Sequence, residues 1–203
     1  MKSPRNVIDE RNRRLLELYI DLVYAEPGRL NLTRVPREDA WARHIEESLD
    51  LLPLRAWTPG ERVIDLGSGA GLPGIPLAIA QPQLRLALIE RDQAKAAFLL
   101  SALGKLELAG VQVLAANATD LGRRSDFAPA DVLISRAALP VPALFTLASR
   151  LLRAGGEGLV HVGKSVVVEE RLRALADRSA LTGLDLVGSR RSRILRFERG
   201  RDR

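Results

Sequence analysis

The chain is poor in metal-ligating side chains and has no long apolar run. Its 203 residues include no cysteine and only two histidines, His44 and His161. Disulfides and thiolate metal sites are therefore excluded, and a zinc site would lack its usual ligands. No run of about eighteen apolar residues occurs, and residues 1–10 show no signal-peptide pattern, so we expect a cytoplasmic protein.

Lysine is also scarce, although the formal net charge is +6. Only four of the 31 basic residues are lysine, at positions 2, 95, 105 and 164. Residues 190–203 hold much of the excess charge, with seven arginines against two acidic residues. Arginine forks bind phosphates and base edges, so the charge permits a nucleic-acid partner. A solvated tail in an arginine-rich protein explains the same charge equally well.

The first sixty residues are expected to be helical, and the whole chain to form one structural unit. Hydrophobic residues make up 46% of it, enough for one substantial core. Residues 5–24 and 37–52 predict amphipathic helices. We therefore expect a helical extension at 1–60 and the main domain at 61–203. The expected apolar stripes are Val7, Ile8, Leu15, Leu18, Tyr19, Leu22 and Val23 in the first helix, and Trp41, Ile45, Leu49 and Leu52 in the second.

From residue 61 onward, strands and helices alternate, which is typical of a parallel sheet covered on both faces. The expected strands are 62–65, 84–90, 111–115, 131–135 and 158–162. The expected helices are 75–81, 92–106, 141–152 and 166–181. Residues 185–188 and 193–197 are expected to form a pair of strands at the edge of the sheet.

Residues 62–76, RVIDLGSGAGLPGIP, carry the strongest local signal. An apolar strand ends at Asp65, and a helical pattern begins near Pro73. Four glycines lie in or just after the turn between them, namely Gly67, Gly69, Gly71 and Gly74. Glycine is needed where a turn is tight or where backbone must approach a ligand closely. A strand, a glycine turn and a helix form the first unit of a nucleotide-type binding sheet, which predicts a cofactor pocket.

Two cofactor classes match this loop. Residues 69–74 fit the G-x-G-x-x-G pattern of dinucleotide folds, and residues 65–71 fit the D-x-G-x-G-x-G loop of S-adenosylmethionine (SAM) methyltransferases. The first dinucleotide glycine should close the strand, but Gly69 lies four residues past Asp65. No basic residue between Asp65 and Gln81 is available for phosphates, and an acidic strand end suits an ammonium group. These points favour SAM over a dinucleotide, and a tight turn that binds nothing is the remaining alternative. The loop pattern predicts cofactor contacts at Asp65, Gly67, Ser68, Gly69 and Gly71.

Three further candidates follow the next expected strands. Glu90 ends the second strand about twenty residues past the loop, where a carboxylate can bind both ribose hydroxyls of an adenosine cofactor. Residues 117–120 follow the third strand, in the place of an adenine-contacting loop. Arg136 follows the fourth strand, where it could meet the cofactor's carboxylate or a substrate base. Plain surface roles are the alternatives, a solvated carboxylate for Glu90 and a salt bridge for Arg136.

Missing residues narrow the reaction. Both tyrosines lie in the first expected helix and no Tyr-x-x-x-Lys pair exists, which argues against a dehydrogenase. Pyrimidine C5 methylation commonly needs a cysteine nucleophile, amine methylation an Asn/Asp-Pro-Pro-aromatic loop, and ribose methylation a Lys-Asp-Lys-Glu set. None of these occurs. Guanine N7 needs none, because its own lone pair attacks the sulfonium methyl and no proton leaves. Small-molecule N- or O-methylation stays open on these residues alone.

The order of the motifs resembles one bacterial family, the small-subunit (16S) ribosomal RNA guanine-N7 methyltransferase G family, also called glucose-inhibited division protein B. The motifs are NLT at 31–33, HI-x-x-S at 44–48, DLGSGAGLPGIP at 65–76, SRA at 135–137 and a late Lys164. The resemblance runs from about residue 31 to the last residues of the chain. The string GAGLPGIP is far more specific than a generic methyltransferase loop.

The resemblance implies a Rossmann-like class I SAM-dependent methyltransferase fold with a mostly parallel seven-stranded sheet. It implies methyl transfer from SAM to N7 of one guanine in a loop of 16S rRNA. We expect the protein to act as a monomer on rRNA or a pre-30S particle, and to hold no metal. The implied cofactor contacts are Gly67, Leu72, Ala118, Thr119 and Arg136, with Glu90 as ribose ligand. The implied catalytic residues along the base-entry cleft are His44, Ser48, Arg136 and Lys164.

Alternatives remain for some of these roles. His44 and Ser48 share one helix face at i and i+4, so packing against the sheet explains them as well. Residues 117–119 read Asn-Ala-Thr where many members carry Arg-x-Glu, so backbone contacts to the adenine are expected there. A non-catalytic RNA-binding or assembly protein that keeps the fold is the alternative from another class. The intact glycine loop and Glu90 argue against it, because an unused pocket needs neither.

Overall fold

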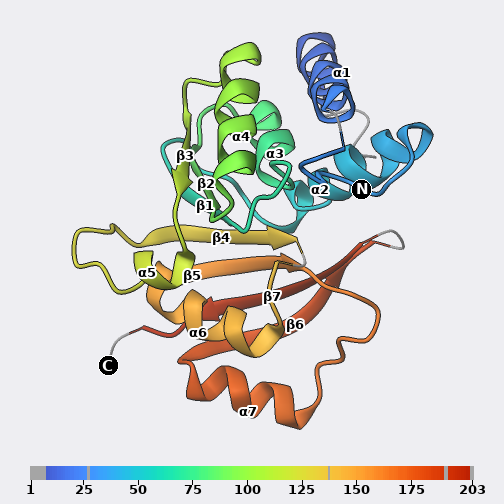
Figure 1. The fold of residues 1–203 in the computed structure, drawn as a ribbon. Coiled ribbons are helices and arrows are strands. Elements are labelled where there is room, and N and C mark those ends of the chain that lie inside the picture. The colour runs from blue at the N-terminus through green and yellow to red at the C-terminus, as the bar shows by residue number, and fades with distance from the viewer. Residues whose placement is uncertain (1–7, 27, 137, 190–191, 202–203) are drawn as a thin grey trace.

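The computed structural model describes residues 8–26, 28–136, 138–189 and 192–201. Its centre is a seven-stranded sheet with the order β3-β2-β1-β4-β5-β7-β6 (Figure 1). The strands are β1 (Arg62–Leu66), β2 (Arg85–Glu90), β3 (Val111–Ala115), β4 (Ala130–Arg136), β5 (Leu152–His161), β6 (Leu181–Gly188) and β7 (Arg193–Arg199). The first five run parallel, and β7 is antiparallel to both β5 and β6. The strand order reverses between β1 and β4, and open α/β sheets bind ligands at the carboxyl ends of strands at such a point.

Helices cover both faces of the sheet (Figure 1). One face carries α1 (Glu10–Ala25), a π-helix (η3, Trp41–Glu46), α2 (Glu47–Leu49), α3 (Gly74–Ala80) and α4 (Gln93–Lys105). The other carries α5 (Ala118–Leu121), α6 (Val141–Leu151) and α7 (Glu170–Arg178). Side chains alternate between the two cores along each strand, so Val63 belongs to the first core and Ile64 to the second.

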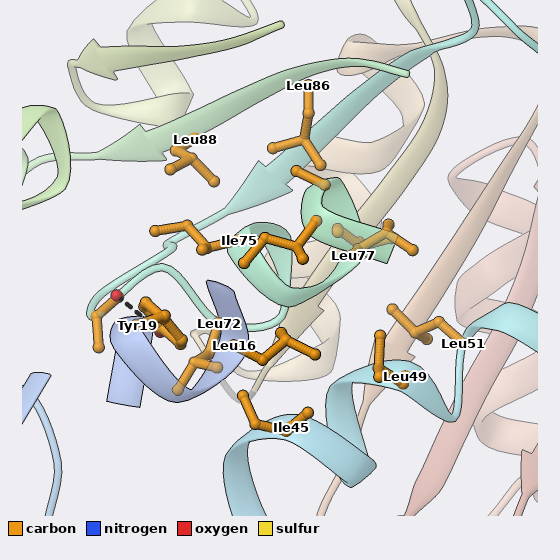
Figure 2. Packing of buried hydrophobic residues seen from close by; sticks show 14 of the residues in the cluster. Leu16, Tyr19, Ile45, Leu49, Leu51, Leu72, Ile75, Leu77, Leu86 and Leu88 are labelled. Carbon is orange, nitrogen blue, oxygen red and sulfur yellow. Dashed lines mark hydrogen bonds between the residues drawn. The ribbon is translucent and has the colours of Figure 1, made fainter. Parts of the chain in front are cut away.

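The N-terminal helices are part of the first core. Leu16 and Tyr19 of α1 are fully buried and belong to the same cluster as Leu72, Ile75 and Leu88 (Figure 2). Asp9 begins α1, because its carboxylate accepts a hydrogen bond from the Asn12 amide at 2.7 Å. The expected boundary between residues 60 and 61 stays a prediction.

The predicted helices before residue 60 were partly wrong. The buried face of α1 is Leu16, Tyr19, Ile20 and Val23, whereas Leu15 and Leu22 are half-buried and Leu18 is 39% exposed. The helix is therefore rotated relative to the predicted stripe, and its expected start at residues 5–7 lies outside the described residues. The predicted helix 37–52 is instead a 3-10 turn (η2, Arg37–Asp39), the π-helix, α2 and a second 3-10 turn (η4, Leu52–Leu54). A 3.6-residue period cannot reveal such changes of winding. Ile45 and Leu49 are buried as predicted, whereas Trp41 and Leu52 are half-buried.

All seven predicted strands are present, and the largest errors lie after β4. β5 begins six residues earlier than expected, where β4 and β5 shift register near Ala130. α7 begins at Glu170 instead of 166, because Val166–Val168 are β-branched and the Arg193 guanidinium donates to the carbonyls of Lys164 and Val166. β6 begins at Leu181 instead of 185, directly after a left-handed Ala180. Within the described ranges, no helix has the length and apolarity needed to cross a membrane.

Candidate functional site

Residues 67–74, the cofactor loop, leave the carboxyl end of β1 and lead into α3. Gly67 has φ +68°, and a Cβ there would lie 2.5 Å from the Ala138 Cβ, so the segment after β4 packs directly on this glycine. Gly69 has φ +57°, and a Cβ there would meet no atom within 4 Å. Both need a left-handed backbone, but only Gly69 faces open space. The loop is thus closed by packing at one glycine and open to a ligand at another.

Asp65, near the end of β1, holds the last residue of this loop. Its side chain is fully buried, and Oδ2 accepts a hydrogen bond from the Gly74 amide at 3.0 Å. Burial raises the pKa of Asp65 to about 7, against the opposing effects of the Gly74 amide and the Arg136 charge. Its other oxygen, Oδ1, has no hydrogen-bond partner among the described residues. A buried carboxylate with a spare acceptor suits a cationic group at this strand end.

Glu90 fastens the same loop from β2. Its Oε2 accepts from the Gly69 amide at 2.9 Å, and its Oε1 accepts from the Asp92 amide at 2.8 Å. Each carboxylate oxygen keeps a second lone pair, so the group can still accept from ribose hydroxyls. Glu90 is 8% exposed and lies at the end of β2 beside the cofactor loop, and its predicted role as ribose ligand stays a prediction.

The predicted adenine loop lies after β3, one strand further along. Asn117 accepts from the Thr119 amide at 2.9 Å and so begins α5, a short helix that the sequence did not predict. Ala118 and Thr119 are half-buried in its first turn. β1, β2 and β3 are parallel neighbours, so their carboxyl ends meet at one edge of the sheet. The fold brings the predicted cofactor residues to that edge.

Arg136 ends β4 and points toward the N-terminal helices. Its Nη1 donates to the carbonyl of Arg43 at 2.9 Å. The Arg136 charge opposes the rise in the pKa of Asp65 that burial causes, and it adds to the fall in the pKa of His44. The guanidinium therefore lies within electrostatic reach of the end of β1 and of the π-helix. Burial lowers the pKa of Arg136, while Tyr19, Glu47 and Asp65 oppose that effect. Arg136 thus joins the N-terminal helices to the cofactor edge.

His44 and Ser48 share one helix face as predicted, but neither side chain reaches the surface. His44 is 2% exposed, and its Nε2 lies 2.9 Å from the Thr33 hydroxyl. Ser48 is fully buried and donates to the His44 carbonyl at 2.5 Å. Burial lowers the pKa of His44 to about 4, so it is neutral at pH 7. Both side chains therefore pack inside the protein, as the alternative to a cleft role predicted. Their roles in a base-entry cleft stay predictions.

Lys164 lies apart from this group, exposed on the segment after β5. Its backbone carbonyl accepts from Arg193 at 2.6 Å. A cavity of about 340 Å³ separates that segment from the one after β4, lined among others by Ser135, Leu139, Val160 and Gly163. This cavity lies at the carboxyl ends of β4 and β5, beside Ala138, which also lines it and packs on the cofactor loop.

Two buried polar residues near Arg136 escaped prediction. Tyr19 donates from its hydroxyl to the Ala70 carbonyl in the cofactor loop at 3.0 Å. His161 is opposite Arg136 in the β4–β5 register, and its Nε2 lies 2.9 Å from the Glu47 carbonyl. Only the expectation of one packed unit hinted at such contacts, because both join distant parts of the chain. Within the described ranges, no three metal-ligating side chains gather at one place.

Comparisons with known proteins identify the family. The family model described as GidB, rRNA small subunit methyltransferase G, matches residues 12–185. The ribosomal RNA small subunit methyltransferase G of Acidiphilium cryptum is 41% identical over 162 residues, which are 76% of this chain and 70% of that one. The enzyme of that name from Moorella thermoacetica is 34% identical over 151 residues, 73% of this chain and 63% of that one. The chain thus spans about two thirds of the length of these curated relatives.

A solved structure supports the fold independently. A putative sarcosine dimethylglycine methyltransferase from Galdieria sulphuraria superposes with a TM-score of 0.62 at 13% identity, covering 95% of this chain and 99% of the other. The predicted class I methyltransferase fold is confirmed, including its seven-stranded sheet with one antiparallel strand. The family is one of SAM-dependent methyltransferases, which confirms SAM as the predicted cofactor in place of a dinucleotide. As its motif order predicted, the chain belongs to the rRNA small subunit methyltransferase G family.

Proposed function

We propose that this chain transfers a methyl group from SAM to N7 of a guanine in a loop of 16S rRNA. Family membership supports the reaction and the RNA. The structural observation that carries the proposal is the cofactor loop, with Gly69 open to a ligand and two strand-end carboxylates beside it. As part of the proposal, the protein acts as a cytoplasmic monomer on rRNA or a pre-30S particle.

The residues present fit SAM. Glu90 would accept from the ribose hydroxyls, and Ala118 and Thr119 would lie against the adenine. Residues 67–72 and Asp65 would surround the amino-acid part, with the spare Asp65 oxygen available to its ammonium group. When bound, SAM supplies an electrophilic methyl group on its sulfonium.

The protein's task is then mainly positioning. Guanine N7 carries a lone pair and loses no proton, so no general base is required. His44 has a lowered pKa and stays neutral, which avoids adding a positive charge near a guanine that becomes cationic. Arg136 holds the Arg43 carbonyl and so fixes the N-terminal helices against the cofactor edge. In this proposal, His44, Ser48 and Arg136 shape the base-entry side and Lys164 contacts RNA.

The target guanine has to leave its neighbours to reach this edge. Sequence-specific RNA recognition generally uses unstacked bases in loops, and enzymes that modify bases take them out of the stack. In this proposal, an extruded base would approach the 340 Å³ cavity beside Ala138. The exposed Lys164 lies on the segment that borders it. This arrangement supports a single-stranded RNA loop as substrate over duplex RNA.

The test is a labelling experiment. Purified protein is incubated with tritiated SAM and with RNA or 30S subunits from a strain lacking its own copy of this enzyme, and labelled bases are mapped by mass spectrometry. We expect 7-methylguanine at a single loop position. A protein that binds SAM and RNA but labels no base would overturn the reaction and favour an assembly role.

A further inference from the structure

We propose that Tyr19 is a positioning residue of the cofactor site, through which helix α1 sets the conformation of the cofactor loop. The inference rests on the proposed function only for the identity of the ligand, SAM. It assigns part of the N-terminal extension to cofactor binding, whereas the family resemblance implies base-entry roles for His44 and Ser48 of that extension.

The contact that carries the proposal is a buried hydrogen bond between distant parts of the chain. The Tyr19 hydroxyl donates to the Ala70 carbonyl at 3.0 Å. Both residues are buried, because Tyr19 is fully buried and Ala70 is 4% exposed. Ala70 lies between Gly69, which faces open space, and Gly71. The dashed line at Tyr19 in Figure 2 marks this bond.

This bond completes a pair of restraints on one peptide group. The Ala70 carbonyl and the Gly71 amide belong to the same planar unit. Tyr19 holds the carbonyl end, and the Ser68 carbonyl accepts from the Gly71 amide at 2.7 Å. The preceding Gly69 amide is held by Glu90 at 2.9 Å. With both ends of the Ala70–Gly71 peptide fixed, the left-handed backbone of Gly71, at φ +99°, is set before a ligand arrives, and the Glu90 bond holds the chain on the Gly69 side.

The hydroxyl is not needed for packing. The Tyr19 ring lies among Leu16, Leu72 and other apolar side chains, where phenylalanine would fill the same space (Figure 2). A buried hydroxyl without a partner is unfavourable, and so is a buried carbonyl without one. Burial also raises the pKa of Tyr19, so the hydroxyl stays a neutral donor across the physiological range. The group that phenylalanine would lack is the one that bonds the loop.

The same helix provides a matched control. Tyr24 donates from its hydroxyl to the Val35 carbonyl at 2.7 Å, outside the cofactor loop. Tyr19→Phe removes the bond to the Ala70 carbonyl, whereas Tyr24→Phe removes the bonds to the Val35 and Pro36 carbonyls, so only the first variant touches the loop. Replacing Tyr19 with 4-aminophenylalanine by nonsense suppression keeps the ring and restores a donor, so it serves as the rescue variant.

The experiment measures SAM binding by calorimetry without RNA, and amide hydrogen exchange of residues 67–74 without SAM. For Tyr19→Phe we expect an SAM Kd weakened about tenfold at unchanged stoichiometry, as for loss of one buried hydrogen bond, with faster exchange in the loop. Tyr24→Phe should stay within about twofold of the wild type, and the amino variant within about threefold. In turnover assays, Tyr19→Phe should raise the KM for SAM and leave kcat at saturating SAM unchanged.

Several outcomes would overturn the proposal. One is a wild-type Kd and wild-type loop exchange in Tyr19→Phe, and another is equal weakening by both phenylalanine variants. A lower binding stoichiometry with a melting temperature far below that of Tyr24→Phe would show a merely structural role. Wild-type protein that binds SAM but labels no RNA would contradict the proposed reaction and leave the Tyr19 test intact. Failure of the wild type to bind SAM would overturn both.

Discussion

The cofactor loop and the segment after β5 lie at the same edge of the sheet but are built in opposite ways. Every residue of the cofactor loop, 67–74, is buried or half-buried, and Asp65, Glu90 and Tyr19 each hold one of its backbone groups. In the post-β5 segment, residues 162–169, five of the eight residues are exposed. Its carbonyls at Lys164 and Val166 are held by one side chain, that of Arg193.

The difference corresponds to the two ligands proposed. A small cofactor contacts mainly backbone atoms of its loop, so the loop needs a fixed conformation and buried hydrogen-bond partners before the ligand arrives. A large RNA is met by exposed, charged side chains, which need little local order. Substitutions at the two places should therefore act on different quantities, SAM affinity at the first and RNA affinity at the second.

The largest effect should come from closing the cofactor loop at Gly67. Gly67→Ala places a methyl group 2.5 Å from the Ala138 Cβ at a left-handed backbone. The segment after β4 must move, and we expect SAM affinity to fall at least about 100-fold, or roughly 2.7 kcal/mol. Calorimetric titration with SAM measures the loss.

Gly60→Ala is the control for backbone strain alone. Gly60 has φ +79° in the turn before β1, and a Cβ there meets no atom within 4 Å. It should cost about 1 kcal/mol of unfolding free energy and leave the SAM Kd unchanged. If both variants weakened SAM equally, strain anywhere near β1 would explain the effect, and the contrast between a packed loop and an open one would fail.

The same contrast explains what the sequence could predict. All seven strands, and the carboxylates at Asp65 and Glu90, follow from local signals: apolar runs, turn glycines and strand ends. Tyr19 and Ala70 are 51 residues apart, and His161 and Glu47 are 114 apart. No local period encodes such contacts, so Tyr19 and His161 could be found as links to the N-terminal helices only in the fold, whereas Arg136 was already a candidate from its place after β4.

The segment after β5 was mispredicted for the same reason. A helix from 166 is reasonable from local pattern, but Arg193, nearly thirty residues later, bonds the Lys164 and Val166 carbonyls. The burial of His44 and Ser48 likewise depends on Thr33 and on the helix winding near Glu46. Substrate-side roles therefore remain less predictable than the cofactor loop.

Substitutions of two basic residues should have effects of intermediate size and separate catalysis from RNA binding. Arg136 is half-buried and holds the Arg43 carbonyl, whereas Lys164 is exposed. Arg136→Ala should lower kcat about tenfold or more, because the N-terminal helices lose a charged hydrogen bond, and should weaken RNA binding less than about threefold. Lys164→Ala should weaken RNA binding by a similarly modest factor at unchanged kcat and reduce the salt dependence of binding by about one counterion. Single-turnover kinetics and filter binding across a salt series measure both. Equal kcat for wild type and Arg136→Ala would contradict a role of Arg136 in catalysis.

A stability measurement decides whether His44 belongs with the buried region or with the exposed one. Its pKa is lowered by burial to about 4, below the ordinary value of 6.5. A depressed histidine pKa means that the unfolded chain binds more protons between these values, so the stability it contributes is complete above pH 6.5 and is lost as pH falls toward 4. The unfolding free energy of wild type should fall between pH 7 and pH 4.5, and that of His44→Gln should fall by roughly 2 kcal/mol less. His161 is present in both proteins and cancels in the difference. Urea unfolding at pH 7 and pH 4.5 measures that difference, and an NMR titration of the two histidines reports the pKa directly. A His44 pKa near 6.5 would show that its ring is solvated in solution and would contradict its place in the buried region.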